Sequence, residues 1–306
     1  MLQRRSLYKI YNVLFVYSAF LQPAMRCLVY RGPGTSTRSV TSTVESLRRA
    51  LARHQITYTV QTATPADLLS SEDEWEATTS LLAFPGGADV PYCNSLGAVG
   101  IDRVRRYVES GGRYLGICAG AYFASGAVSF EPGTDLEVVG ERHLKFYRGL
   151  ATGAAFSGFS YESERGAVCA RIRFTSSLGG SDWETCLDYV NGGPLWMMDD
   201  TDDTSVFRIN SVNHSRLKGV DVLATYEDLH HAVAAMRCRV GRGVAVLCGS
   251  HPELHHSHIV EADAGDDPVY AEHVQRLKQN LGDHEAGRRK FFDLCVDAAI
   301  QTKVTN

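Results

Sequence analysis

The chain has 306 residues, of which 44% are hydrophobic and 22% are charged. These ordinary globular values exclude collagen-like, low-complexity and wholly disordered chains. Its 31 Lys and Arg against 35 Asp and Glu give a formal net charge of −4. Because a basic surplus is absent, we expect no nucleic-acid partner. A chain of this length buries about 75% of its unfolded surface, so its core needs neither metals nor disulfides.

Cysteine spacing indicates the compartment. The eight cysteines are scattered singly, without a Cys-x-x-Cys pair, at Cys27, Cys93, Cys118, Cys169, Cys186, Cys238, Cys248 and Cys295. This pattern is typical of separate thiols rather than of a zinc ribbon or a disulfide framework. It favours a reducing compartment, and we expect a cytoplasmic protein.

Residues 1–24 form a leader with two open interpretations. Arg4, Arg5 and Lys9 precede an apolar run at residues 13–21, which resembles a signal-peptide core or a membrane-surface helix. The alternative is an unstructured extension before Met25. The run is shorter than the roughly 20 residues that span a bilayer, and no other segment is a transmembrane candidate. We expect residues 25–306 to form a single domain.

Strands and helices alternate in the first part of the chain. Apolar runs near Gly or Pro predict strands at residues 26–30, 81–84 and 114–117, and a second strand is expected at residues 56–60. Apolar residues at helical spacing predict the helices between them, the first with Ser39 as its N-cap. This order predicts an α/β fold, with a parallel sheet that has helices on both faces.

The pattern changes between about residues 140 and 243, where short alternating runs are separated by Gly, Asn and Asp turns. It predicts antiparallel additions to the sheet. The run at residues 244–248 returns to the continuous apolar character of a buried parallel strand, and two helices end the chain.

Cys118 is the candidate nucleophile. It lies in Gly-Ile-Cys-Ala-Gly at residues 116–120, after a predicted strand and before a helix. Small residues two positions to either side permit the sharp turn that presents a nucleophile, and the positive end of a helix favours a thiolate. The alternative is a buried cysteine in a Gly-rich packing turn.

His251 and Glu253 follow another buried strand, in Gly-Ser-His-Pro-Glu at residues 249–253. Catalytic groups gather at the carboxyl ends of parallel strands, so Cys118 and His251 are expected on one rim. The histidine would move the thiol proton, and Glu253 would orient the ring. In an extended segment, residues two apart point the same way. The alternative is a loop with a solvated carboxylate.

A third strand end supplies candidate oxyanion donors. The loop at residues 84–89 contains Gly86 and Gly87, whose backbones can approach a ligand closely. We assign the donors to the N–H of Gly87, or of Gly86, together with that of Ala119. The histidines at 251, 255, 256 and 258 suggest zinc, but Pro252 disfavours the helix that such spacing needs, and we expect no metal.

These motifs resemble class I glutamine amidotransferases, which have a flavodoxin-like fold and a Cys-His-Glu triad. The closer resemblance is to the amidotransferase-like N-terminal domain of eukaryotic, notably fungal, biotin-protein ligases. It covers about residues 26–300 through motifs at residues 29–36, 84–92, 116–125, 136–140, 191–194 and 249–253. The resemblance implies a flavodoxin-like, mostly parallel sheet flanked by helices, with antiparallel additions around residues 140–243, and a triad of Cys118, His251 and Glu253.

The departures limit what the resemblance implies. Such ligases carry their catalytic domain after this one, whereas residues 239–243 here form only a hairpin turn, so biotin transfer by this chain alone is not expected. The amidotransferases place a substrate-binding glutamine shortly after the nucleophile, where this chain has Gly120, Ala121 and Tyr122. We expect Gly120 and Tyr122 in the pocket, and hydrolysis of glutamine is left open.

Three functions therefore stand as hypotheses. The first is a cysteine-dependent amidase or hydrolase acting on a small amide-containing substrate, without a cofactor. The second is a non-catalytic regulatory or interaction module with a separate protein partner, such as a biotin ligase. The third is a zinc hydrolase on the histidine cluster. The retained triad slightly favours the first.

Overall fold

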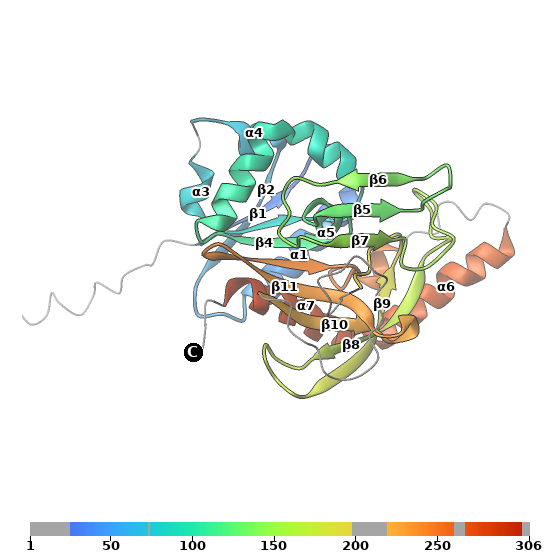
Figure 1. The fold of residues 1–306 in the computed structure, drawn as a ribbon. Coiled ribbons are helices and arrows are strands. Elements are labelled where there is room, and N and C mark those ends of the chain that lie inside the picture. Colours follow the sequence, from blue (N-terminus) through green and yellow to red (C-terminus); the bar gives the residue numbers. More distant parts are fainter. Residues whose placement is uncertain (1–24, 73, 198–218, 260–266, 302–306) are drawn as a thin grey trace, which may run out of the picture.

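The structure is a computed structural model that describes residues 25–72, 74–197, 219–259 and 267–301 (Figure 1). The predicted leader at residues 1–24 lies outside this part of the chain. Within the described residues, no helix combines the length and the apolar character that crossing a bilayer requires.

Five parallel strands form one half of a nine-stranded sheet. They lie in the order β2-β1-β3-β4-β12, namely β2 (Tyr58–Ala63), β1 (Met25–Tyr30), β3 (Thr79–Phe84), β4 (Arg113–Ile117) and β12 (Gly243–Cys248). This is the 2-1-3-4-5 order of flavodoxin-like sheets, which confirms the predicted fold class. The carboxyl ends of β3, β4 and β12 therefore share one edge.

Side chains alternate between the two faces of this half. Cys27 and Val29 of β1 pack with α1 (Thr37–Leu51) and α7 (Glu285–Ile300), whereas Leu28 and Tyr30 pack with α4 (Asp89–Glu109) and α5 (Ala119–Phe123). Each face thus has its own apolar core, as expected for a parallel sheet that is covered on both sides. The remaining short helices are α2 (Pro65–Leu69), α3 (Trp75–Thr78), η1 (Glu227–Leu229) and η2 (His256–His258).

Two local predictions were wrong. The second strand begins at Tyr58, two residues later than expected. The first helix is capped by Ser36, whose side chain accepts from the N–H of Ser39, while the Ser39 side chain accepts from the N–H of Ser36. Ser39 therefore closes a capping box as its third helical residue, because the helix begins one turn earlier.

The predicted antiparallel additions are confirmed, with a wider extent. The large sheet continues with β11 (Ala232–Val240), β10 (Val220–Tyr226), β8 (Val168–Thr175) and β9 (Trp183–Val190), all antiparallel. A separate sheet has the order β6-β5-β7 and contains β6 (Val138–Glu141), β5 (Ala127–Phe130) and β7 (Leu150–Gly153). It begins before residue 140, and its β5–β7 pair is parallel.

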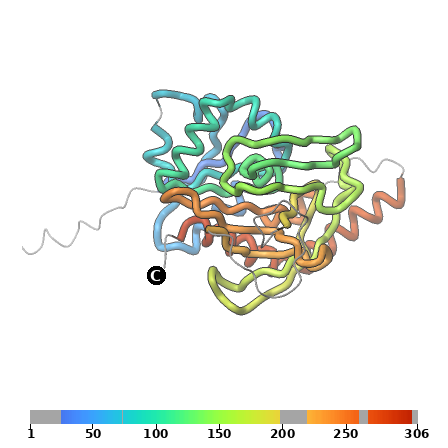
Figure 2. Tube along the Cα trace, in the orientation of Figure 1, coloured from blue at the N-terminus to red at the C-terminus, as the bar shows by residue number. Residues whose placement is uncertain are grey.

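The small sheet lies beside α5 and is joined to the large sheet by single bridges (Figures 1 and 2). Thr152 of β7 pairs with Leu195, and the next residue, Trp196, pairs with Val233 of β11. On the far edge, α6 (Pro268–Asp283) packs Val274 and Leu281 against Tyr189 of β9. We call the described residues between 127 and 240 the antiparallel extension, and the five parallel strands with their helices the parallel half.

Candidate active site

Cys118 occupies a strained turn between β4 and α5. Its φ of 49° and ψ of −104° lie in a region that side chains rarely adopt, and its N–H donates to the carbonyl of Cys248 at 2.8 Å. A Cβ on Gly116 would lie 2.5 Å from the carbonyl oxygen of Gly120. The two glycines therefore allow the chain to fold tightly around Cys118, and backbone strain of this kind clusters at functional sites.

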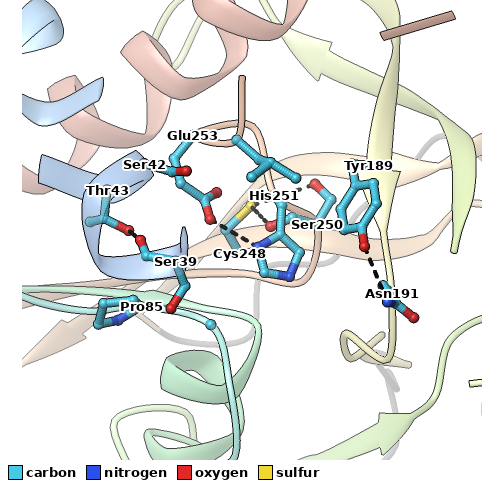
Figure 3. A network of polar contacts seen from close by, with 12 residues as sticks. Ser39, Ser42, Thr43, Pro85, Tyr189, Asn191, Cys248, Ser250, His251 and Glu253 are labelled. Atoms are coloured by element: carbon cyan, nitrogen blue, oxygen red, sulfur yellow. Dashed lines mark hydrogen bonds and ion pairs between the residues drawn. The ribbon is translucent and has the colours of Figure 1, made fainter. Parts of the chain in front are cut away.

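His251 and Glu253 meet at the end of β12. The His251 Nδ1 lies 2.9 Å from the Glu253 Oε1, and the carboxylate is buried, with Glu253 only 2% exposed (Figure 3). The segment is not extended as we predicted. It forms a turn in which the N–H of Leu254 donates to the His251 carbonyl at 3.1 Å, and this turn brings the carboxylate back to the imidazole.

The surroundings of His251 favour its charged form. Burial lowers the pKa of His251. The charges of Glu253 and Cys118 and hydrogen bonds to both side chains raise it, and their combined effect is larger than that of burial. The result is a pKa well above its ordinary value of 6.5. The imidazole therefore has a carboxylate partner at its Nδ1 and Cys118 among the groups that raise its pKa, a combination that can hold and move a proton.

The glycine loop after β3 approaches the same ring. A Cβ on Gly86 would lie 2.4 Å from the His251 Cε1, so only a glycine leaves room for the imidazole. Gly87 has a φ of +144°, and its own Cβ would lie 1.8 Å from the carbonyl oxygen of Gly34. In the described residues, the N–H groups of Gly87 and Ala119 have no protein acceptor, as an oxyanion site requires.

A pocket opens beside Cys118. Its lining includes three of the expected residues, Gly87, Ala119 and Tyr122, but neither Gly86 nor Gly120. Gly86 packs on His251, and a Cβ on Gly120 would lie 2.1 Å from the carbonyl oxygen of Phe84. These two glycines serve close packing behind the pocket. The antiparallel extension forms most of the opposite wall with Val128, Phe130, Val138, Phe159, Tyr161, Asn191 and Gly192.

A buried arginine that sequence reasoning missed secures the His251 segment. Arg288 of α7 is 1% exposed, and its Nε donates to the Asp188 Oδ1 at 2.8 Å. Its Nη2 donates to the carbonyls of His251 at 2.9 Å and Leu254 at 2.5 Å. An arginine in a C-terminal helix is usually solvated, so no local pattern indicated this role.

A second missed group lies beside the imidazole. The Tyr189 ring meets the His251 ring edge to face at 5.6 Å, and the Tyr189 hydroxyl donates to Glu164, which also binds Arg38. The Asn191 Nδ2 donates to the Tyr189 hydroxyl at 3.1 Å (Figure 3). Asn191 was noticed in the sequence only as part of a motif.

The histidine cluster divides. His251 joins Glu253, whereas His255 and His256 lie with Glu285, their candidate ligand atoms all within 4.8 Å of one another. The Glu285 oxygens accept from Arg289 at 2.8 Å and from Arg288 at 3.2 Å. These two guanidinium groups already neutralise the carboxylate, which opposes binding of a further cation.

Comparison with known proteins relates the chain to two proteins. It is 33% identical over 261 residues to the biotin--protein ligase of Schizosaccharomyces pombe, a match that covers 84% of this chain. The chain spans only 38% of the length of that ligase. It is 36% identical over 276 residues to an uncharacterized protein of Chlamydia muridarum, covering 85% of this chain and 97% of that protein.

Among solved structures, a glutamine amidotransferase from Thermotoga maritima matches with a TM-score of 0.52 and 10% identity, covering 90% of this chain and 98% of that one. This likeness concerns the fold alone. The chain also matches the family described as "Biotin-protein ligase, N terminal" over residues 25–305. The resemblance that we drew from the motifs is confirmed, and the chain belongs to the biotin-protein ligase N-terminal domain family.

Proposed function

We propose that the protein is a cysteine-dependent amidase, with Cys118 as nucleophile, His251 as acid and base, and Glu253 as the group that orients the imidazole. The observation that supports this most is the His251 ring, whose Nδ1 lies 2.9 Å from the Glu253 Oε1 and whose Cε1 lies against Gly86 of the loop after β3. Three segments distant in sequence converge there, and a packing role alone does not require that arrangement.

In the first half of the proposed reaction, the Cys118 thiolate attacks the amide carbon and forms the C–S bond. The carbonyl oxygen takes negative charge, which the N–H groups of Gly87 and Ala119 stabilise. The His251 imidazolium gives its proton to the amide nitrogen, the C–N bond breaks, and the amine or ammonia leaves. The products of this half are a thioester on Cys118 and a neutral imidazole.

In the second half, water attacks the thioester carbon while His251 takes a proton from it. The C–S bond breaks, the acid leaves, and Cys118 is again a thiolate beside an imidazolium. Amide and water have become acid and amine, without an oxidant or a cofactor. Glu253 holds the same ring orientation throughout, because its Oε1 accepts from the Nδ1 of His251.

Alkylation with iodoacetamide near neutral pH tests this proposal. Burial raises the pKa of the Cys27, Cys169 and Cys238 thiols to about 12, and also raises the pKa of Cys93, Cys186 and Cys248. These thiols should therefore stay unmodified while Cys118 is labelled. Cys118→Ala should abolish the labelling, and the matched variant Cys93→Ala should retain it. A wild-type protein without preferential labelling at Cys118 contradicts the proposal.

A second candidate is a non-catalytic module that binds a biotin ligase. The supporting observation is that the matched region of the Schizosaccharomyces pombe ligase lies within a much longer chain, of which this chain covers 38%. Affinity capture with purified biotin ligase tests it. Binding that survives Cys118→Ala, with no amidase activity in the wild type, favours the module over the enzyme.

We further propose that residues 25–306 form one domain and that the protein works in a reducing, cytoplasmic environment. The family match over residues 25–305 supports the first statement. All eight cysteines are free, which supports the second. Limited proteolysis tests the first, because a single domain should leave one protected core fragment.

A further inference from the structure

We infer that the pocket beside Cys118 selects an uncharged amide whose acyl group is short and apolar and carries an N–H donor, and that it rejects substrates with a free carboxylate. This inference rests on the proposed amidase function and specifies its substrate class. Glutamine, which carries a carboxylate at the end remote from its amide, is then a poor substrate.

The wall opposite Cys118 is largely apolar. Val128, Phe130, Val138 and Phe159 line it, and the Phe130 and Phe159 rings meet edge to face at 5.3 Å. Among the described residues that line the pocket, none is Lys, Arg or His. A carboxylate moved from water to this wall would lose its hydration without gaining a cationic partner, which is costly.

Two side-chain donors of the lining, those of Asn191 and Tyr122, are already used. The Asn191 Nδ2 donates both to the Ser163 carbonyl at 2.9 Å and to the Tyr189 hydroxyl at 3.1 Å. The Tyr122 hydroxyl donates to the Gly192 carbonyl at 3.1 Å. The N–H groups of Gly87 and Ala119, which have no acceptor, belong to the position of the reacting carbonyl. Apart from the reacting Cys118 and the Tyr161 hydroxyl at the exposed mouth, the side-chain donors of the described lining are thus used.

One side-chain acceptor of a lining residue has no partner. The Asn191 Oδ1 is buried and has no hydrogen-bond partner, although it belongs to a residue that lines the pocket. A buried acceptor without a donor is destabilising, so a ligand N–H at this position would be favoured. This atom selects for donors such as amides and against carboxylates, whose oxygens would face it with like partial charge.

The acidic residue of the lining adds no net charge. Asp89 is 8% exposed, and its Oδ2 accepts from the Nε of Arg142, which is 6% exposed. Arg142 does not itself line the pocket, and its charge neutralises that of Asp89. The pair is neutral as a whole and offers a carboxylate no attraction.

The free space also limits the acyl group. About 30 Å³ of the pocket is open to the centres of water-sized groups, where about 10–15 Å³ is enough to hold one water. A short chain is therefore the best fit, and anything longer must extend past Tyr161, which is 48% exposed at the mouth.

Two chloromethyl ketones of equal chain length test the inference, one ending in a primary amide and the other in a carboxylate. Each rate of Cys118 labelling in the full chain is divided by the rate with N-acetylcysteine, which removes differences in intrinsic reactivity. We expect the amide-ended probe to label at least about 10-fold faster. Equal rates, or faster labelling by the carboxylate, overturn the inference.

Charge introduced at the mouth gives an independent test. Tyr161→Arg should raise the relative rate of the carboxylate-ended probe by about 10-fold, because it supplies the missing cation. Tyr161→Gln controls for loss of the ring, and Val99→Arg, at a site 68% exposed and outside the pocket lining, controls for net charge. Neither control should raise that rate, and a similar rise in either overturns the inference.

Iodoacetamide separates the two levels of the proposal. If it labels Cys118 selectively while the two ketones react equally, the amidase proposal stands and the substrate inference fails. If neither iodoacetamide nor the ketones label Cys118 preferentially, the amidase proposal itself fails, and the substrate inference falls with it.

Discussion

The parallel half and the antiparallel extension contribute different things to the candidate site. Cys118, His251 and Gly87 all follow strands of the parallel half, at the edge where β4, β12 and β3 end. The wall opposite them comes from the extension, through Phe130 and Asn191 among others. The difference suggests that one half performs the proposed chemistry and the other chooses the substrate, a division that α/β folds permit because function resides in sites added to a scaffold.

Among the changes that test this division, removing the proposed base from the parallel half should have the largest effect on the reaction rate. His251→Ala is expected to lower the rate of amide hydrolysis by about 10³-fold, because no neighbouring group would supply the proton to the leaving nitrogen. Ammonia release in a coupled assay measures it. His256→Ala is the matched control, since the His256 ring lies by Glu285 and outside the pocket lining. Equal losses in the two variants would assign the effect to folding.

Stability should depend strongly on the buried ion pair that joins the two regions, Arg288 of α7 with Asp188 of β9. Arg288→Met is expected to lower the free energy of unfolding by about 3–5 kcal/mol, because the buried Asp188 carboxylate would lose its charged partner. Guanidinium denaturation measures the change. Arg289→Met is the control, since its side chain is 49% exposed and its ion pair with Glu285 is worth less than about 1 kcal/mol. Comparable losses would show that Arg288 does not organise the His251 segment.

A change in the extension should alter selectivity and leave the thiol reactive. Phe159→Ala removes a ring that contacts Phe130 at 5.3 Å and Tyr161 at 4.8 Å. We expect the labelling rate of the amide-ended ketone to fall about 10-fold, since one partly buried apolar ring is lost from its wall. Iodoacetamide is too short to reach that wall, so its rate should change little. If both labelling rates fell to the same extent, the extension would not act on selectivity separately from the thiol.

The smallest expected effect concerns pH. The pKa of His251 is raised in the folded protein, so its stabilising contribution is complete below the unfolded value of about 6.5 and is lost as pH rises through the folded value. The difference in unfolding free energy between wild type and His251→Gln should therefore shrink with rising pH. Glu253→Gln should flatten this trend, because the carboxylate is the first of the groups that raise the pKa. A difference that grows with pH contradicts the assignment.

Much of the parallel half was predictable because its signals are local. Continuous apolar runs ending in Gly or Pro located four strands within two or three residues, and the spacing of Gly116 and Gly120 around Cys118 indicated a tight turn. Helix ends were less certain, since Ser36 and Ser39 are both good caps and only tertiary packing selects between them. The short alternating runs between turn residues predicted the extension, but they did not predict that its β5–β7 pair is parallel.

The sequence predicted the reacting groups of the candidate site, but it did not predict the residues that hold these groups in place. Cys118, His251 and Glu253 belong to short motifs, whereas Arg288 lies 37 residues after the His251 carbonyl that it binds. Asn191 directly precedes Gly192 and Gly193 in the sequence, and nothing local indicates that its Oδ1 is left without a partner. Such roles arise from contacts between distant elements, which spacing along the chain does not encode.

By itself, the sequence determined the class of fold, the family and the three residue types of the proposed chemistry, because periodicity and short motifs are properties of neighbouring residues. The tertiary structure alone decided how the pocket is walled, which donors are already used and where charge is neutralised. These depend on close packing of segments far apart in the chain, where a shift of an ångström makes or breaks a hydrogen bond. The turn at Cys118 could be predicted from the five residues 116–120, whereas the pocket wall beside it could not be predicted from any short segment.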